Sequence, residues 1–350
     1  MNDEHRSIVD DAAKSIKTVP FVLIAPLDRF ASEMQEIQFE DGLEISKIPN
    51  EVLTYLDEKY PLDKHMPSFQ RLALSRARHA IRVNYEMSEA MVNDTSAIER
   101  ASRLVTTLRL ADRGEVAIPI FLSRPLGVHP IVPMQGDIAR SALSINIFGD
   151  LYKLVPPRDN LCKRFWNVFN PLLTAQSESA SGDKLILALR RFNIAYERSD
   201  YYDRLLDVIV GFEILYGTGA ESSYRVCSRM SQLLGRSDDE RTGIFALISQ
   251  GFKARNDIVH RGTTERVWKI AGEEWSLGRL IDRLRRLLAE SSKATMLICG
   301  DETMKARCKN KQPPLEALAH MLEEASLSSM ARKDLEAMAS KYDSLIWSDS

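Results

Sequence analysis

An arginine and a histidine separated by four residues stand near the predicted C-terminal end of a long helix. Arg255 begins the run Arg-Asn-Asp-Ile-Val-His, which ends at His260, and Gly262 follows two residues later. A guanidinium group can clamp a phosphate through two hydrogen bonds, and an imidazole transfers protons near neutral pH. Arg255 and His260 are therefore a candidate pair for cutting a phosphodiester bond without a metal ion.

The spacing of this pair carries little information by itself, because the chain has 6 histidines and 47 lysines and arginines. The same spacing occurs in Arg124–His129. That copy contains a proline and a glycine and precedes Pro130, so we interpret it as a loop without a catalytic role. The role of Arg255 and His260 therefore depends on the elements that surround them in the fold.

The composition is that of an ordinary globular protein. The 350 residues are 44% hydrophobic and 27% charged, which is compatible with two domains and a buried core. The formal net charge of -2 does not favour a generally polycationic nucleic-acid coat, although it permits a local basic site. The polar N-terminus and the short apolar run over residues 20–26 lack the features of a secretory signal or a membrane span. We expect a cytoplasmic protein with no membrane partner and with reduced, mostly buried cysteines.

Residues 1–149 are predicted to form an α+β domain. Buried or alternating apolar runs predict strands at 21–25, 43–48, 80–85 and 115–122. Apolar residues at helical spacing predict a helix over 96–113, which Gly114 ends. We expect this domain to sense a trigger or to select a target.

From about residue 150 the pattern becomes helical almost throughout. The predicted helices cover 158–174, 183–198, 200–216, 221–234, 238–260 and 277–298, with a polar loop over 175–182. Ser199 is the expected N-cap of the third helix, and Ser237 opens a capping box with Glu240. We predict a helical domain over 150–304 and a further helical segment over 305–350, which follows the break at Pro313-Pro314.

Three runs in these helices share the order and placement of motifs in a known family. They are Ala188–Phe192, Gly211–Leu215 and Ala254–His260. The set resembles the HEPN superfamily, in particular its Apea-like branch, over roughly residues 150–300. The resemblance implies an all-α helical bundle that forms homodimers. It also implies a metal-independent endoribonuclease of the kind found in toxin, antiviral defence and RNA-processing systems. Other members of the superfamily are non-catalytic modules that bind RNA or protein, and this alternative stays open.

One position departs from the pattern of some members. Members that a partner nucleotidyltransferase adenylylates continue the motif as His-x-Tyr. Here Gly262 occupies the tyrosine position, so we do not expect that form of regulation. An unidentified activator or inhibitor remains a candidate partner.

The spacing of the pair favours a site shared by two subunits. Residues five apart on an ideal helix point about 140° apart, so Arg255 and His260 do not share one face. Two copies related by a twofold axis can place both groups in one cleft. There His260 would deprotonate a ribose 2′-hydroxyl or protonate the leaving 5′-oxygen, while Arg255 stabilises charge on the phosphate. The products would be a 2′,3′-cyclic phosphate and a 5′-hydroxyl. The alternative is a cationic helix end with a solvated arginine.

Further residues are candidates for supporting roles around this pair. Asn256 could bind the phosphate or orient His260, and Glu213 could hold Arg255 or form a structural ion pair. A basic stripe on one helix face could guide an RNA backbone, or could be a solvated face; it consists of Arg279, Arg283 and Arg286. The sequence has no phosphate-binding loop, dinucleotide fingerprint or zinc motif, so we expect neither a cofactor nor a metal ion in the site.

Overall fold

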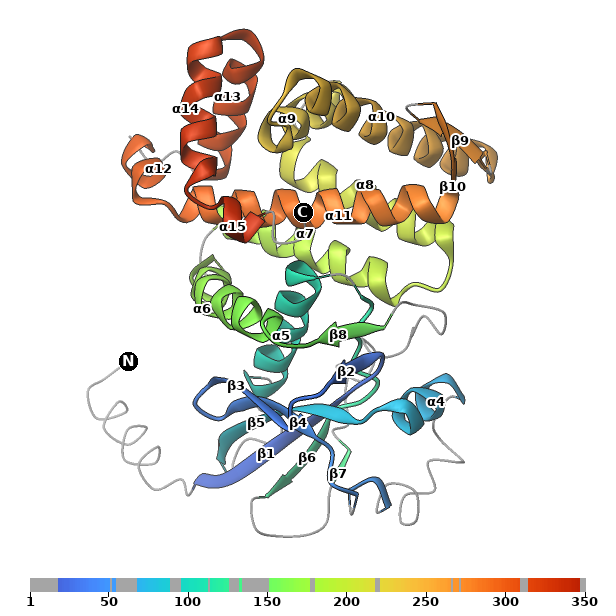
Figure 1. Cartoon of the computed structure of the whole chain (residues 1–350), viewed down its shortest axis with the longest axis vertical. Coiled ribbons are helices and arrows are strands. Elements are labelled where there is room, and N and C mark those ends of the chain that lie inside the picture. Colours follow the sequence, from blue (N-terminus) through green and yellow to red (C-terminus); the bar gives the residue numbers. More distant parts are fainter. Residues whose placement is uncertain are drawn as a thin grey trace, which may run out of the picture. The chain divides into compact units, whose positions relative to one another are not determined.

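The structure is a computed structural model of the chain (Figure 1). It describes residues 18–50, 52–54, 68–88, 96–112, 114–125, 132–133, 151–176, 180–217, 221–265, 267–270, 272–308 and 314–346. The chain divides into two compact units. The first unit consists of Met1–Val105 with Gly114–Lys163, and the second of Thr106–Arg113 with Arg164–Ser350.

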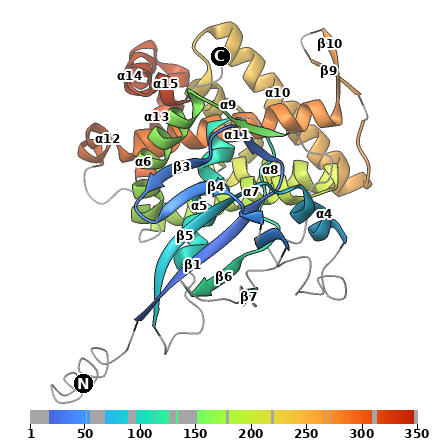
Figure 2. The ribbon, with the colours of Figure 1, turned by 60° about the horizontal axis from the view of Figure 1, so that its bottom comes forward.

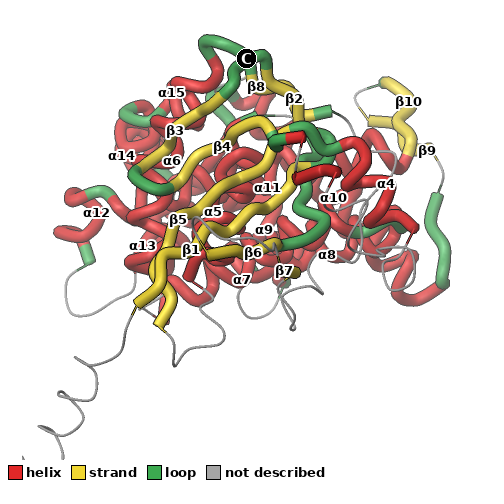
Figure 3. The backbone as a smooth tube through the Cα atoms, turned by 90° about the horizontal axis from the view of Figure 1, so that it is seen from below, coloured by secondary structure: helices red, strands yellow, loops and turns green. Residues whose placement is uncertain are grey.

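A six-stranded antiparallel sheet forms the framework of the first unit (Figure 2). Its strands are β1 (Thr18–Leu27), β3 (Glu36–Glu40), β4 (Leu43–Lys47), β5 (His79–Ser88), β6 (Leu122–Pro125) and β7 (Val132–Pro133). They lie side by side in the order β3-β4-β5-β1-β6-β7 (Figure 3). The two central strands β1 and β5 pair along their whole length. The strands predicted at 21–25, 43–48 and 80–85 are therefore confirmed.

The remaining elements of this unit are shorter. They are β2 (Phe30–Ser32), β8 (Tyr152–Leu154) and the helix α4 (Ser68–Arg76), while α5 (Ser96–Ala111) begins in this unit and ends in the second. Strands β2 and β8 pair in parallel. The helix predicted over 96–113 is confirmed by α5.

The strand predicted over 115–122 is largely wrong. In that segment only Ala117 forms an isolated bridge, to Asp28, and β6 begins at Leu122. The segment is nevertheless mostly buried, which explains its strand-like pattern of apolar residues. Pro119 cannot donate a backbone hydrogen bond, so it interrupts a ladder at this point.

Buried charges hold the turn that follows β1. Asp28 is fully buried, and its carboxylate accepts a hydrogen bond of 2.9 Å from Arg76. Arg29 has a left-handed backbone conformation with φ of 54° and donates a hydrogen bond of 3.0 Å to Glu115. Burial raises the pKa of Asp28 above its ordinary value. Each charge therefore depends on its partner for compensation within the core.

The second unit is built mainly from helices, the first of which, α6, begins in the first unit and continues into the second from Arg164. They are α6 (Arg158–Gln176), α7 (Ala180–Glu197), α8 (Tyr201–Tyr216), α9 (Ser222–Leu234), α10 (Asp238–Arg261), α11 (Leu277–Gly300), α12 (Glu302–Arg307), α13 (Pro314–Leu327), α14 (Ser329–Ser340) and α15 (Asp343–Ile346). Helix α11 packs against α7, α8, α9, α10 and α13. All of its residues from Leu287 to Cys299 are buried except Glu290. None of the described helices has the length and apolar composition that crossing a lipid bilayer requires.

The coarse prediction of an α+β part followed by a helical part is confirmed, but the second part is not all-α. A two-stranded hairpin of β9 (Val267–Ile270) and β10 (Glu273–Ser276) lies between α10 and α11 in the sequence. The single segment predicted at the C-terminus is divided into α13, α14 and α15. Ser328 caps α14 and thereby ends the preceding helix, because its hydroxyl accepts a hydrogen bond from the backbone of Ala331.

Three finer predictions need correction or fall partly outside the described residues. The N-cap of α8 is Asp200 and not Ser199, since the Asp200 carboxylate accepts hydrogen bonds from two backbone amides of the first turn. The loop predicted over 175–182 is shorter, because helix covers residues up to 176 and again from 180, and 177–179 lie outside the description. Arg124 lies in β6 rather than in a loop, and residues 126–131, which include His129, lie outside the described part of the chain.

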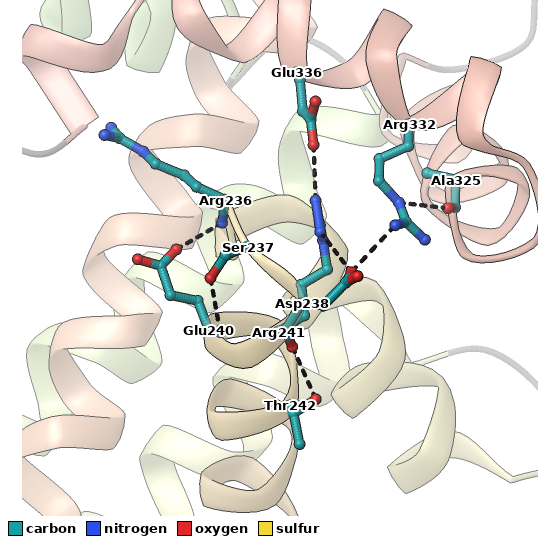
Figure 4. A network of polar contacts seen from close by, with 9 residues as sticks. All are labelled: Arg236, Ser237, Asp238, Glu240, Arg241, Thr242, Ala325, Arg332 and Glu336. Carbon is teal, nitrogen blue, oxygen red and sulfur yellow. Dashed lines mark hydrogen bonds and ion pairs between the residues drawn. The ribbon is translucent and has the colours of Figure 1, made fainter.

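A network of polar contacts anchors the start of α10 (Figure 4). The Ser237 hydroxyl accepts a hydrogen bond of 3.1 Å from the Glu240 amide, which is one half of the predicted capping box. The Glu240 carboxylate accepts a hydrogen bond of 2.7 Å from the amide of Arg236, one residue before the cap. The Arg241 guanidinium donates one hydrogen bond of 3.1 Å to the Asp238 carboxylate and another of 2.7 Å to the Glu336 carboxylate of α14. Arg332 of α14 donates a further hydrogen bond of 3.3 Å to Asp238. The N-terminus of α10 is thereby tied to the helical hairpin of α13 and α14.

Candidate functional site

The candidate pair lies in the last two turns of α10, and this helix has defined ends. Ser237 caps its N-terminus, and Gly262 adopts φ of 70° and ends the helix with a hydrogen bond from its amide to the Ile258 carbonyl. Only glycine adopts this left-handed conformation without strain from a side chain. An ion pair of 2.9 Å between Lys253 and Glu265 also ties the chain that follows the helix back to α10. The glycine cap therefore defines the helix end that carries His260, and the ion pair adds little because both of its side chains are exposed.

Arg255 is partly buried and has two partners. Its Nη1 atom donates a hydrogen bond of 3.0 Å to the Asn256 side-chain oxygen. Its Nη2 atom lies 3.9 Å from Glu213 Oε2 of α8, which is within the range of an ion pair but beyond a hydrogen bond. About a third of each side chain in this ion pair is exposed, 31% for Arg255 and 29% for Glu213. The guanidinium is positioned by its neighbours but remains accessible to an anion from solvent.

His260 lies one turn further on and is exposed. Among the described residues it makes no hydrogen bond or ion pair, and Asn256 contacts Arg255 instead of His260. Because α10 is regular up to Arg261, Arg255 and His260 keep the offset of about 140° that an ideal helix gives. A single subunit therefore does not bring the two groups onto one face.

The predicted basic stripe lies on α11, and two of its arginines have acidic partners. Arg279 bonds Glu273 at 2.7 Å and stacks over the Trp275 ring at 4.3 Å. Arg283 lies 3.6 Å from Glu290. Arg286, the third member, is half-buried. The stripe is therefore less positive than its sequence suggests.

The most informative feature that sequence reasoning missed is the β9–β10 hairpin and the pocket beside it. The pocket has a volume of about 400 Å³ and lies between α10, α11 and the hairpin. Trp275 and Ile270 of the hairpin line one side of it. The signal in the sequence was the alternation of Val267–Ile270 followed by Gly272, which adopts φ of 83° at the turn. Each strand has only four residues, so the alternation is short.

Comparison of the chain with protein-family models, with curated proteins and with solved structures gives no match. Within the described ranges, the structure contains no group of three or more histidine, cysteine, aspartate or glutamate side chains placed to hold a metal ion. The chemistry of the site must therefore be inferred from its own residues.

Proposed function

We propose that this protein is a metal-independent endoribonuclease of HEPN type, and that its active site forms between two copies of the chain. The observation that carries the proposal is the placement of a positioned arginine and an exposed histidine in one capped helix end. When two α10 ends meet across a twofold axis, the face of one helix that carries Arg255 can oppose the face of the other that carries His260. The offset of about 140° between Arg255 and His260 on one helix then places the two groups to face their counterparts on the other helix.

In the shared cleft, the imidazole of His260 moves the proton and Arg255 stabilises the phosphate. His260 takes the proton of the ribose 2′-hydroxyl, whose oxygen attacks the adjacent phosphorus as the bond to the 5′-oxygen breaks. The proton returns to the 5′-oxygen, so the products are a 2′,3′-cyclic phosphate and a 5′-hydroxyl. Arg255 donates hydrogen bonds to the phosphate oxygens as negative charge builds up on them. Asn256 and Glu213 are positioning residues that hold the guanidinium.

The proposal is tested by incubating the purified full chain with labelled single-stranded RNA in the presence of a chelator. We expect cleavage that falls by about 100-fold to 10,000-fold in His260→Ala, the range that general acid–base catalysis contributes. Arg255→Lys keeps the charge but loses the two-pronged geometry, so it should also be strongly impaired.

A matched control is Arg261→Ala. Arg261 is adjacent to His260 and 75% exposed, and its partner is Asp257 at 3.3 Å. This variant should cleave like the unaltered protein. Cleavage that persists unchanged in both His260→Ala and Arg255→Lys would refute the proposed site.

A second candidate function is a non-catalytic module that binds RNA or protein. The pairing of Arg255, Arg279 and Arg283 with glutamates favours the protein-binding form of this module, since paired arginines attract an RNA phosphate less strongly. This function predicts that RNA or a protein partner is bound and remains intact. It also predicts no difference in RNA integrity between the unaltered chain and His260→Ala.

A further inference from the structure

The exposed side of α7 combines apolar and basic side chains. The helix packs against α8 and α11, and its buried side consists of Leu185, Ala188, Leu189, Phe192, Ala195 and Tyr196. On the other side, Leu187 is 43% exposed and Ile194 is half-buried. The only acidic residue between positions 184 and 198 is Glu197, whose carboxylate lies 3.7 Å from buried Arg109 of α5. The surface called the α7 face below consists of Lys184, Leu187, Arg190, Arg191, Ile194 and Arg198.

The α7 face has a repeat of seven residues. Lys184, Arg191 and Arg198 form a basic column, and Leu187 and Ile194 form an apolar column beside it. Arg190 lies on the far side of the apolar column. Residues seven apart on a helix point within about 20° of one direction and lie about 10 Å apart along the axis. An apolar column with charged residues on both sides is the pattern with which one helix packs lengthwise against another.

A buried carboxylate holds two of the arginines in place without neutralising both of them. Asp207 of α8 accepts a hydrogen bond of 3.0 Å from Arg191 Nη1 and one of 3.2 Å from Arg198 Nε. The side chains of these arginines are 40% and 44% exposed, and their remaining N–H groups are donors for a further carboxylate. Because both guanidiniums are positioned in advance, binding an anionic partner costs less conformational entropy.

Lys184 and Arg190 add positive charge that is not compensated within the described part of the chain. Both side chains are exposed, and neither makes a hydrogen bond or an ion pair with another described residue. The four cations of the α7 face and the one carboxylate of Asp207 together carry a net charge of +3, whereas the whole chain has a formal net charge of -2. The face therefore complements a partner that is acidic as well as partly apolar.

We propose that the α7 face binds an acidic amphipathic helix of a partner protein. The apolar side of that helix covers Leu187 and Ile194, and its carboxylates bond the cations on either side. An RNA strand fits this face less well, because its phosphates would bond the arginines without covering the apolar column between them. The α7 face is distinct from Arg255 and His260 on α10, so the inference does not depend on the proposed ribonuclease activity.

The probe is a synthetic helical peptide of three identical heptads, with leucine in one column and glutamate in the columns on both sides. Its binding to the full chain is measured by titration calorimetry. Arg190→Glu should weaken binding at least tenfold, since it replaces an attraction with a repulsion, and Leu187→Ser should weaken it severalfold. Leu327→Ser is the matched control, because Leu327 at the end of α13 is 90% exposed, and it should bind like the unaltered chain. These side chains are exposed, so each variant should keep the circular dichroism of the unaltered chain.

Three comparisons distinguish the acidic helix from other occupants. A peptide with glutamine in place of glutamate should bind at least tenfold more weakly, and equal binding would overturn the inference. Binding by Leu187→Ser that is as tight as binding by Leu327→Ser would also overturn it. In a His260→Ala background, a single-stranded RNA whose affinity falls in Arg190→Glu but not in Leu187→Ser would identify RNA as the occupant instead. A change in the oligomeric state of Arg190→Glu without peptide, measured by sedimentation, would identify a second copy of the chain instead.

Discussion

Two arginines of α9 contact the same carboxylate oxygen but differ in burial, and they allow a sharp test of the packing of the C-terminal helices. Arg229 is only 4% exposed and bonds Glu323 of α13 at 2.6 Å, while a second N–H donates to the Tyr216 carbonyl of α8. Arg225 is 43% exposed and lies 3.2 Å from the same Glu323 oxygen. We predict that Arg229→Ala destabilises the second unit far more than Arg225→Ala does.

The magnitude follows from what each substitution removes. Arg229→Ala removes the charge-assisted hydrogen bond to Glu323, which is worth about 1.5–3 kcal/mol. It also leaves the backbone carbonyl of buried Tyr216 without the hydrogen bond that Arg229 donates, which costs about 1–3 kcal/mol. Because Glu323 is 39% exposed, water can solvate it afterwards, so we expect a total near the lower end, about 3 kcal/mol. Arg225→Ala removes an exposed ion pair, worth about 0–1 kcal/mol.

Urea denaturation of the two variants, followed by circular dichroism, measures this difference. With an m-value of about 3 kcal/mol/M, the helical transition of Arg229→Ala should shift by about 1 M, and that of Arg225→Ala by less than about 0.3 M. Equal shifts of the two variants would refute the reasoning, because they would show that burial does not set the strength of these contacts.

Three other predictions concern helix packing, pH and thiol reactivity. On α10, Gly243→Ala should raise the free energy of unfolding by up to about 1 kcal/mol, because alanine favours the helix and its methyl group would meet nothing within 4 Å. Gly251→Ala should lower the free energy of unfolding, because its methyl group would meet side chains of α8 and α11 at 3.1 and 2.7 Å. Melting temperatures that shift in the same direction for both variants would contradict this prediction. A hydrogen bond from the buried arginine lowers the pKa of Glu323, so the stability that this ion pair contributes is complete above the ordinary carboxyl pKa and is lost as the pH falls through the lowered value. The effect of removing that arginine should therefore shrink between about pH 6 and pH 3 in the same urea assay. Partly exposed Cys308 should react with a thiol reagent in the folded protein. Burial raises the pKa of Cys227 to about 12, so this thiol should stay unreactive until the chain unfolds. Mass spectrometry of the labelled protein identifies which thiol reacts first.

The sequence predicts the helices of the second unit well because their signals are local. The capping box at Ser237 and the glycine at 262 define α10 from its own residues, and the structure has both ends where they were expected. The N-cap of α8 was placed one residue too early because Ser199 and Asp200 are adjacent and both can cap. Which of them does so depends on the direction in which the chain enters the helix, and only the carboxylate of Asp200 reaches the backbone amides.

Features that depend on how the elements pack together could not be predicted. Glu273 is only 6 residues from Arg279, but it bonds this arginine because it lies on the β9–β10 hairpin, which the sequence analysis did not predict. The buried charges around Asp28 join residues up to 86 positions apart. The pocket beside the β9–β10 hairpin brings together residues as far apart in the sequence as Leu234 and Glu290. Residue types along the chain do not contain this information.

The shared active site is tested most directly by mixing its two inactivated halves. Arg255→Ala and His260→Ala subunits, carrying different affinity tags, are produced together in one cell, and the mixed dimer is purified through both tags. A mixed dimer retains one intact arginine and one intact histidine, contributed by different subunits. We expect it to cleave RNA in the presence of a chelator and to leave 2′,3′-cyclic phosphate ends, while each variant alone is inactive. A mixed dimer as inactive as its two parents, beside an active unaltered dimer, would contradict a site composed in this way.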